Sequence, residues 1–144
     1  MWGILIAILS GALMSLQGIF NSSVTKQTSI WLAAAFVQLS AFCVCAIAYI
    51  TKEREVPVSK LFAVSPKYLL IGGILGAFIT ITVIKGIDLL GAAKAEMFIV
   101  FSQLIVAYVI ELFGWFGVQQ KSFEWNKFFG VALFLAGVIL FKIK

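Results

Sequence analysis

The sequence predicts an all-α membrane protein with five transmembrane helices, and three observations lead to this prediction. Apolar side chains account for 62% of the 144 residues, whereas charged side chains account for only 12%, about half the share of a soluble domain. The charges cluster between apolar runs of roughly 20 residues, the length that crosses a bilayer as a helix. Trp31 and Tyr49 stand at the two ends of one such run, where membrane proteins concentrate aromatic residues. A soluble globular domain is therefore excluded.

The apolar runs are expected to form a single transmembrane domain over residues 1–144, with spans at approximately 2–20, 30–50, 67–87, 93–115 and 125–141. The longest connection, 51–66, holds a charged run and a half-apolar stretch that is too short to cross, so we expect it at the membrane surface. Asp88 follows the third span, three residues after Lys85, and these two side chains are candidates for an ion pair at the interface.

Small residues recur at helical spacing in the first and third spans. Gly3, Ala7 and Gly11 are each four residues apart, and Gly72 and Gly76 form a GxxxG pair. Because such positions allow the backbone of a second helix to approach closely in lipid, we interpret both patterns as helix-packing surfaces.

Amide side chains lie within the first two spans. Gln17 and Asn21 are four residues apart on one helix face, and Gln38 lies near the centre of the second span together with Ser40. Two interpretations remain open for these residues. They hydrogen-bond to neighbouring helices, with Asn21 also capping the end of the first helix, or they line a path for a polar solute.

The fourth span is unusually polar, and we regard it as the first place to look for function. It contains Glu96, Ser102, Gln103 and Glu111, although a carboxylate at mid-depth costs about 2.5–3.5 kcal/mol. Glu96 and Gln103 are seven residues apart and share a helix face within about 20°. The two glutamates either extend to water at the membrane surfaces or line a polar path. Gln103 is too deep to reach water, so it needs a partner in the protein or a ligand.

The basic residues are divided almost equally between the two sides of the membrane. Five spans put six Lys or Arg on the N-terminal side and five on the other: Lys52, Arg54, Lys60, Lys67, Lys121 and Lys127 against Lys26, Lys85, Lys94, Lys142 and Lys144. Since the Lys/Arg bias sets orientation, so small a bias predicts insertion in both directions. Two copies would then form an antiparallel homodimer, a ten-helix inverted-repeat bundle of the kind found in alternating-access transporters. A single orientation paired with an oppositely inserted paralogous subunit also fits.

The residue types present disfavour several other functions. The chain has no His, and Cys43 and Cys45 are two residues apart rather than in a CxxC motif, so we expect no metal site, no cofactor and no enzyme. The net charge of +5 comes from lysines at span ends and forms no basic stripe, so nucleic-acid binding is not expected.

The chain resembles the small five-span YdcZ-like branch of the drug/metabolite transporter superfamily, a relative of the small multidrug resistance proteins. The resemblance covers nearly the whole sequence and rests on SGALMSLQGIFN, YLLIGGILGAF, LLGAAKAEMFIVFSQLIVAYVIELFG and FFGVALFLAGVIL, in this order. It implies a multi-pass protein of the bacterial inner membrane, an exporter that works as an antiparallel pair or as fused halves. By the same resemblance, Gln17, Gln103 and Glu111 occupy motif positions of the family. Small multidrug resistance proteins carry a glutamate in the first span, whereas this chain has only Ser15 and Gln17 there, so their proton/cation exchange does not transfer directly.

Three functions follow from these observations. The leading hypothesis is a secondary transporter that moves polar or organic small molecules by alternating access, with Gln17, Asn21, Gln38, Ser102 and Gln103 as the polar lining. If transport is proton-coupled, Glu96 or Glu111 must carry the proton, because no His or Asp lies within the expected spans. The alternatives are a dual-topology passive channel for ions or solutes and a non-transporting membrane assembly subunit.

Overall fold

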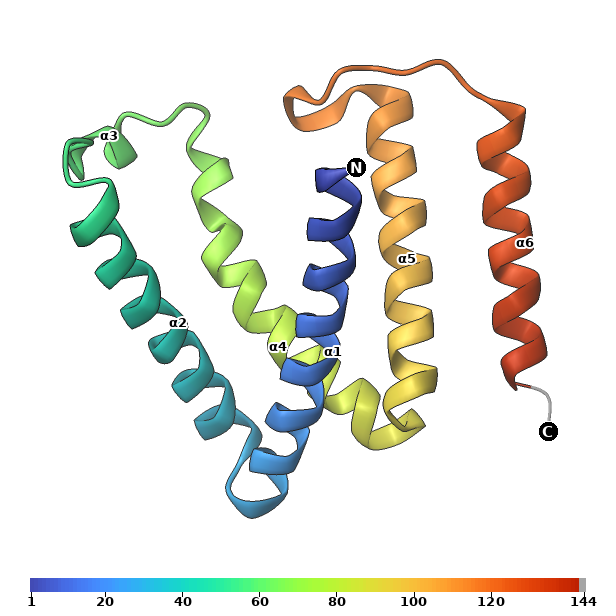
Figure 1. Cartoon of the computed structure of the whole chain (residues 1–144), viewed down its shortest axis with the longest axis horizontal. Coiled ribbons are helices and arrows are strands. Elements are labelled where there is room, and N and C mark those ends of the chain that lie inside the picture. Colours follow the sequence, from blue (N-terminus) through green and yellow to red (C-terminus); the bar gives the residue numbers. More distant parts are fainter. Residues whose placement is uncertain (143–144) are drawn as a thin grey trace. The chain divides into compact units, whose positions relative to one another are not determined.

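The computed structural model describes residues 1–142, and this part consists of helices joined by turns and loops, without a β-strand (Figure 1). Four helical segments are long and apolar enough to cross a membrane: α1 (Trp2–Gln27), α2 (Ile30–Lys52), Lys67–Leu90 and α5 (Ala92–Phe113). The third comprises a 3₁₀ turn, η1 (Lys67–Ile71), followed by α4 (Gly72–Leu90). The predicted all-helical membrane protein is therefore confirmed. Of the basic residues counted above, Lys144 lies outside the described residues.

The fifth apolar helix, α6 (Trp125–Lys142), is shorter than the other four. Its apolar part, Trp125–Phe141, extends about 26 Å at 1.5 Å per residue, slightly less than the roughly 30 Å of a bilayer's hydrocarbon core. The fifth span therefore stays a prediction.

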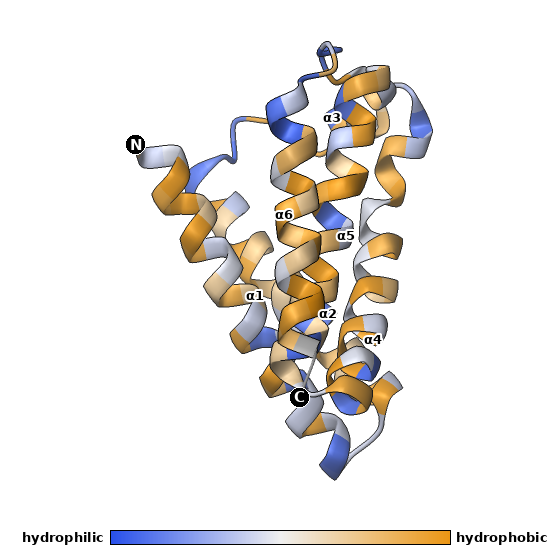
Figure 2. Ribbon diagram, turned by 90° about the vertical axis from the view of Figure 1, so that its right-hand side faces the viewer, coloured by the Kyte–Doolittle hydropathy of each residue, from blue (hydrophilic) through white to orange (hydrophobic). Residues whose placement is uncertain are grey.

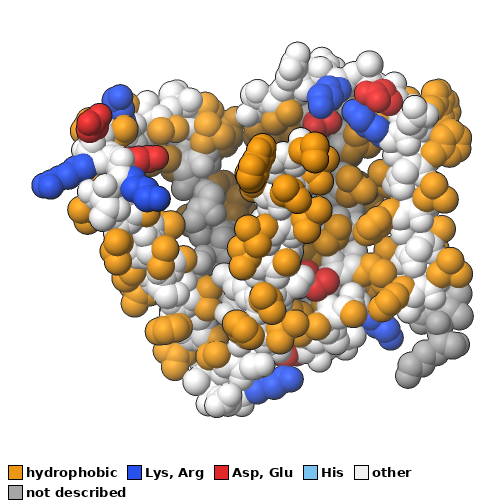
Figure 3. Space-filling view, viewed as in Figure 1, with side chains coloured by type: hydrophobic (Ala, Val, Ile, Leu, Met, Phe, Trp, Pro, Cys, Tyr) orange, Lys and Arg blue, Asp and Glu red, His pale blue; other side chains and the backbone are white. Residues whose placement is uncertain are grey.

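Most apolar side chains lie on the outside of the helices. Hydrophobic residues line the helices and hydrophilic ones gather at their ends and in the loops (Figure 2), and on the face shown in Figure 3 most charged side chains likewise lie near helix ends. Exposed apolar flanks are suited to lipid or to further helices. The buried apolar residues are few and mostly small: Ala33, Ala34, Ile84, Ile87, Ala95 and Val138.

The chain divides into two compact units, of which unit 1 covers Met1–Asp88. In this unit α1 and α2 form an antiparallel hairpin, and the Ser29 hydroxyl at the turn accepts a hydrogen bond from the Leu32 N–H at 3.2 Å, which caps α2. Helix α1 continues to Gln27, well past the expected end of the span, because no Gly or Pro interrupts residues 21–27. Asn21 therefore lies inside α1, and its expected capping role is wrong.

The long connection in unit 1 carries a short helix, α3 (Ser59–Phe62), before α4 begins. Its first part is held to the end of α2, because the Tyr49 hydroxyl donates a hydrogen bond to the Val56 carbonyl at 2.5 Å. Helix α4 then contacts α2 at Gly76, where an added Cβ would lie 3.2 Å from Nε2 of Gln38. This contact is made by the end of a side chain, so close backbone packing at the GxxxG pair stays a prediction.

Unit 2 covers Leu89–Lys144 and contains α5, the 3₁₀ turn η2 (Trp115–Gly117) and α6. Helix α5 ends at Gly114, which adopts the left-handed conformation (φ 65°) that favours glycine. Across the unit, Phe101 of α5 stacks on Phe134 of α6 with ring centroids 5.8 Å apart. This pair helps to hold the two helices together, and the loop between them folds back onto α5, as described below.

Candidate functional site

A groove between α1 and α2 gathers most of the polar residues predicted for unit 1. Gln17 and Asn21 reach it from α1 and Ser40 from α2, and its volume is about 580 Å³. We call it the amide groove. The rest of its lining is apolar or a thiol: Leu13, Leu16, Phe20, Val37, Ala41, Val44 and Cys45. A mainly apolar cleft with a few convergent polar groups is the usual character of a small-molecule site.

The Ser40 hydroxyl has a hydrogen-bond partner in the described chain, whereas the two amides of the groove have none. Ser40 donates to the Val37 carbonyl of its own helix at 2.9 Å, so its hydroxyl is satisfied locally. Asn21 is only 8% exposed, yet its amide makes no hydrogen bond to any residue from 1 to 142, and the same holds for Gln17. The Asn21 amide is not among the inaccessible unpartnered atoms of the described residues, so it stays accessible and can bond to an occupant of the groove.

Gln38 does not line the amide groove. It lies half-buried on α2, against Gly76 of α4, and has no hydrogen bond within the described part of the chain. Gln38 and Ser40 both lie near the centre of the span, but Gln38 contacts α4 whereas Ser40 lines the amide groove.

One end of α1 holds a polar contact that spacing along the sequence does not suggest. The Ser22 hydroxyl donates a hydrogen bond to Oδ1 of Asp88 on α4 at 2.5 Å, and Ser22 itself is buried. Asp88 lies within the candidate span Lys67–Leu90. The candidate spans therefore contain a third carboxylate besides Glu96 and Glu111. The expected ion pair with Lys85 does not form between the described residues, and Asp88 is bound to Ser22 instead.

The polar side chains of α5 in unit 2 differ in whether they have a hydrogen-bond partner in the described chain. Ser102 donates to the Ile99 carbonyl of its own helix at 2.9 Å. Gln103 is exposed and has no hydrogen-bond partner among residues 1–142. Glu96 is half-buried, and its Oε1 is inaccessible and without a hydrogen bond in the described structure.

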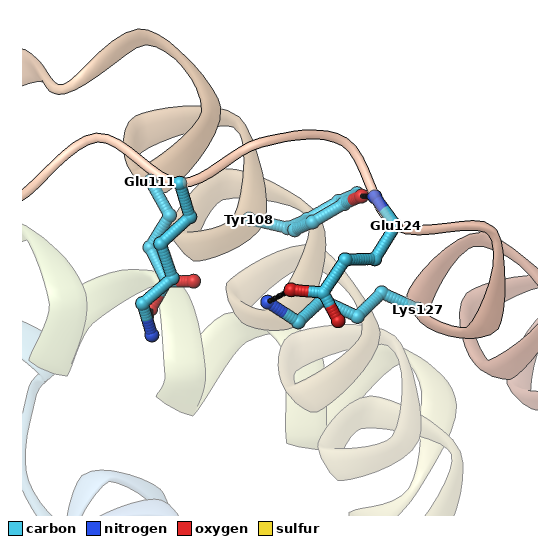
Figure 4. Close-up of polar contacts among 5 residues, drawn as sticks. Tyr108, Glu111, Glu124 and Lys127 are labelled. Carbon is cyan, nitrogen blue, oxygen red and sulfur yellow. Dashed lines mark hydrogen bonds and ion pairs between the residues drawn. The ribbon is translucent and has the colours of Figure 1, made fainter.

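Glu111 lies in a second pocket, about 350 Å³ in volume, between α5 and α6 (Figure 4). We call it the charged pocket, because Glu111 of α5 and Lys127 of α6 line it together with Tyr108. Glu111 pairs with Lys121 of the loop at 3.7 Å, and Lys127 pairs with Glu124 at 3.0 Å. The remaining lining is apolar: Leu104, Ala107, Gly130 and Val131.

The loop after α5 supplies these partners because it is fixed to the last turns of the helix. The Lys121 N–H bonds to the Glu111 carbonyl at 2.9 Å, and the Gln120 side chain bonds to the Leu112 carbonyl at 3.0 Å. The Glu124 N–H donates to the Tyr108 hydroxyl at 3.4 Å. The first two of these bonds satisfy carbonyls that the end of a helix leaves free.

A sequence comparison identifies the family. Residues 2–140 match the model of the family described as "Putative inner membrane exporter, YdcZ". The chain belongs to the YdcZ family. It is therefore a multi-pass inner-membrane protein of an exporter family, and this family is not one of enzymes. No curated protein and no solved structure matches the chain.

Of the small residues predicted to pack helices in this YdcZ-family chain, most have no neighbouring helix against them in the described structure. At Gly3, Gly11 and Gly72 an added Cβ would meet no atom within 4 Å, whereas Gly76 touches Gln38. Ala7 is likewise exposed. Packing at Gly3, Ala7, Gly11 and Gly72 stays a prediction.

Proposed function

We propose that this YdcZ-family protein exports small polar organic molecules by alternating access, with the amide groove as part of the solute path. The observation that supports this most is Asn21, a mostly buried residue whose amide lines a groove of about 580 Å³ and has no hydrogen-bond partner among the described residues. Amides both donate and accept hydrogen bonds, so we expect them to bind neutral or zwitterionic solutes more tightly than lipophilic cations. Gln38, Ser102 and Gln103 are further polar residues of the proposed path.

The transporting unit we propose is an antiparallel pair of identical chains, and an oppositely inserted paralogous subunit is the alternative. The near-equal division of basic residues supports it, since such a chain has little preference for one orientation. Gln103, which has no partner in the described chain, and the unoccupied ribbon at Gly3, Ala7 and Gly11 are the surfaces that a second chain would cover.

If export is driven by protons, Glu96 is the carboxylate best suited to carry them. Its Oε1 is inaccessible and has no hydrogen bond among the described residues, so this carboxylate is not committed to another side chain there. Glu111 instead has Lys121 as a counter-ion and is partly exposed. Glu96→Gln should then abolish proton-driven efflux, and Glu111→Gln should reduce it less. Coupling that survives both substitutions would remove this part of the proposal.

The test is efflux from proteoliposomes. Vesicles containing the purified protein are loaded with a defined mixture of amino acids, polyamines and nucleosides, and the solutes that leave are measured by mass spectrometry under an inward proton gradient. We expect at least one neutral or zwitterionic solute to leave faster than from protein-free vesicles. Replacing both groove amides, Gln17→Leu with Asn21→Leu, should slow this efflux roughly tenfold to hundredfold, because two hydrogen bonds of about 1 kcal/mol or more are lost.

The matched control is Gln27→Leu, since Gln27 is an exposed glutamine on the same helix and does not line the groove. This variant should transport at the unmodified rate. Wild-type efflux in the double variant would contradict a solute path through the amide groove. Efflux that does not saturate and does not respond to the gradient would indicate a passive channel instead.

A further inference from the structure

The charged pocket of unit 2 presents two opposite charges to one space. Glu111 of α5 and Lys127 of α6 line the same pocket, and Figure 4 shows Lys127 paired with Glu124. No ion pair joins Glu111 and Lys127 among the described residues. The Lys127 Nζ also lies 5.9 Å from the centre of the Tyr108 ring. An occupant would therefore meet a negative group, a positive group and an aromatic face within one pocket.

The protein's own partners for these two charges are exchangeable. Lys121 and Glu124, which pair with Glu111 and Lys127, have side chains that are about half exposed, at 52% and 50%. Exposed ion pairs of this kind contribute between about 0 and 1 kcal/mol. A ligand carrying both charges can thus replace them at little cost.

The pocket lies where α5 ends and α6 begins, beside a cluster of aromatic rings. Trp125 packs against Phe123, Phe128 and Phe129 with ring centroids 5.3–6.1 Å apart, and Trp115 stacks on Phe113 at 5.1 Å. Tryptophan-rich clusters at span ends are typical of the headgroup level of a bilayer. The apolar wall of the pocket, Leu104, Ala107 and Val131, continues along the two helices away from this level.

We propose that the charged pocket binds the headgroup of a zwitterionic phospholipid that carries a primary ammonium, of the phosphoethanolamine type. The ammonium would donate hydrogen bonds to the Glu111 carboxylate beside the Tyr108 ring, and the phosphate would accept from Lys127. The acyl chains would follow Leu104 and Val131. An anionic headgroup leaves Glu111 facing negative charge, and a trimethylammonium has no N–H to donate. The proposal goes beyond solute export and does not depend on it.

The test compares lipids on purified, delipidated protein in detergent by native mass spectrometry. Phosphatidylethanolamine, phosphatidylglycerol and phosphatidylcholine with identical acyl chains are added separately, and bound lipid is counted. We expect phosphatidylethanolamine to be retained roughly three- to tenfold more than the other two, with this preference lost in both Glu111→Gln and Lys127→Gln. Two variants are used because Glu111 also anchors the loop, whereas Lys127 is not bonded to α5.

The matched controls are Lys52→Gln at the end of α2 and Glu55→Gln in the long connection of unit 1, both exposed residues, which should keep the wild-type preference. Equal retention of the three lipids, or an unchanged preference in both pocket variants, would overturn the proposal. So would soluble phosphoethanolamine that displaces the lipid at equal concentration, because the pocket would then recognise a water-soluble zwitterion without needing acyl chains. Loss of solute efflux with intact lipid preference would leave this proposal standing and remove only the exporter mechanism.

Discussion

The two units solve the problem of polar groups in a membrane in different ways. In unit 1 the groups that face the groove are neutral amides, and one of them, Asn21, is buried. In unit 2 the groups that face the pocket are charged, lie near helix ends and have partly exposed partners. A charge at mid-depth costs about 2.5–3.5 kcal/mol, whereas near the surface it stays hydrated. This difference underlies our two proposals, solute contact for the amides and headgroup contact for the charges.

The comparison implies that unit 1 depends on tight contacts between its helices. Gly76→Leu should lower the free energy of unfolding by about 2 kcal/mol, because the new side chain must displace Gln38, whose Nε2 lies 3.2 Å from the Cβ position. The measurement is unfolding in a mixed-detergent titration. Gly73→Leu is the control, since an added Cβ there meets nothing within 4 Å. Equal losses in both variants would show that α4 does not pack against α2 as described.

The hydrogen bond between Ser22 and Asp88 tests whether α1 and α4 are joined by a specific contact. Ser22→Ala should lower the free energy of unfolding by about 1.5 kcal/mol, the lower end for a hydrogen bond to a charged group, since Asp88 is partly exposed. Ser23→Ala is a matched control one residue away, because Ser23 is exposed and its hydroxyl makes no hydrogen bond to the described chain. A Ser23→Ala loss as large as that of Ser22→Ala would argue against the contact.

The smallest effect is expected in unit 2. Lys121→Gln removes the ion pair with Glu111 but keeps the backbone hydrogen bond between the same residues, so the loss should stay below about 1 kcal/mol and shrink further at high salt. Hydrogen exchange in the loop 114–124 should increase only modestly. If Lys121→Gln destabilised the protein more than Ser22→Ala does, the charges of unit 2 would be structural, and the contrast between the units would fail.

The sequence was sufficient to predict the helices, because a long apolar run in a membrane has few alternatives to a helix. Helix ends were harder to predict. The polar residues 21–27 look like a loop, yet α1 continues through them to Gln27. The groove residues Gln17 and Asn21 were found from their spacing of four, which puts them on one face of α1.

The contacts that the sequence missed join residues that are far apart or separated by a turn. Ser22 and Asp88 are 66 positions apart, and nothing local in the sequence pairs them. Glu111 and Lys121 meet because the chain reverses after α5 through three residues with positive φ, Gly114, Phe116 and Gly117, which brings the loop back onto α5. A glycine at the end of an apolar helix was the one available signal for this reversal.

The most direct test of the account uses the two native cysteines. Cys45 lines the amide groove and Cys43 does not, although both are exposed on α2. In membrane vesicles, a charged, water-soluble thiol reagent is applied to Cys43→Ala, which keeps Cys45, and to Cys45→Ala, which keeps Cys43. Because only a hydrated thiol ionises and reacts, a solute path through the groove predicts rapid labelling of Cys45 and little labelling of Cys43. Equal labelling of the two, or a Cys45 that stays unreactive, would contradict a water-accessible groove between α1 and α2.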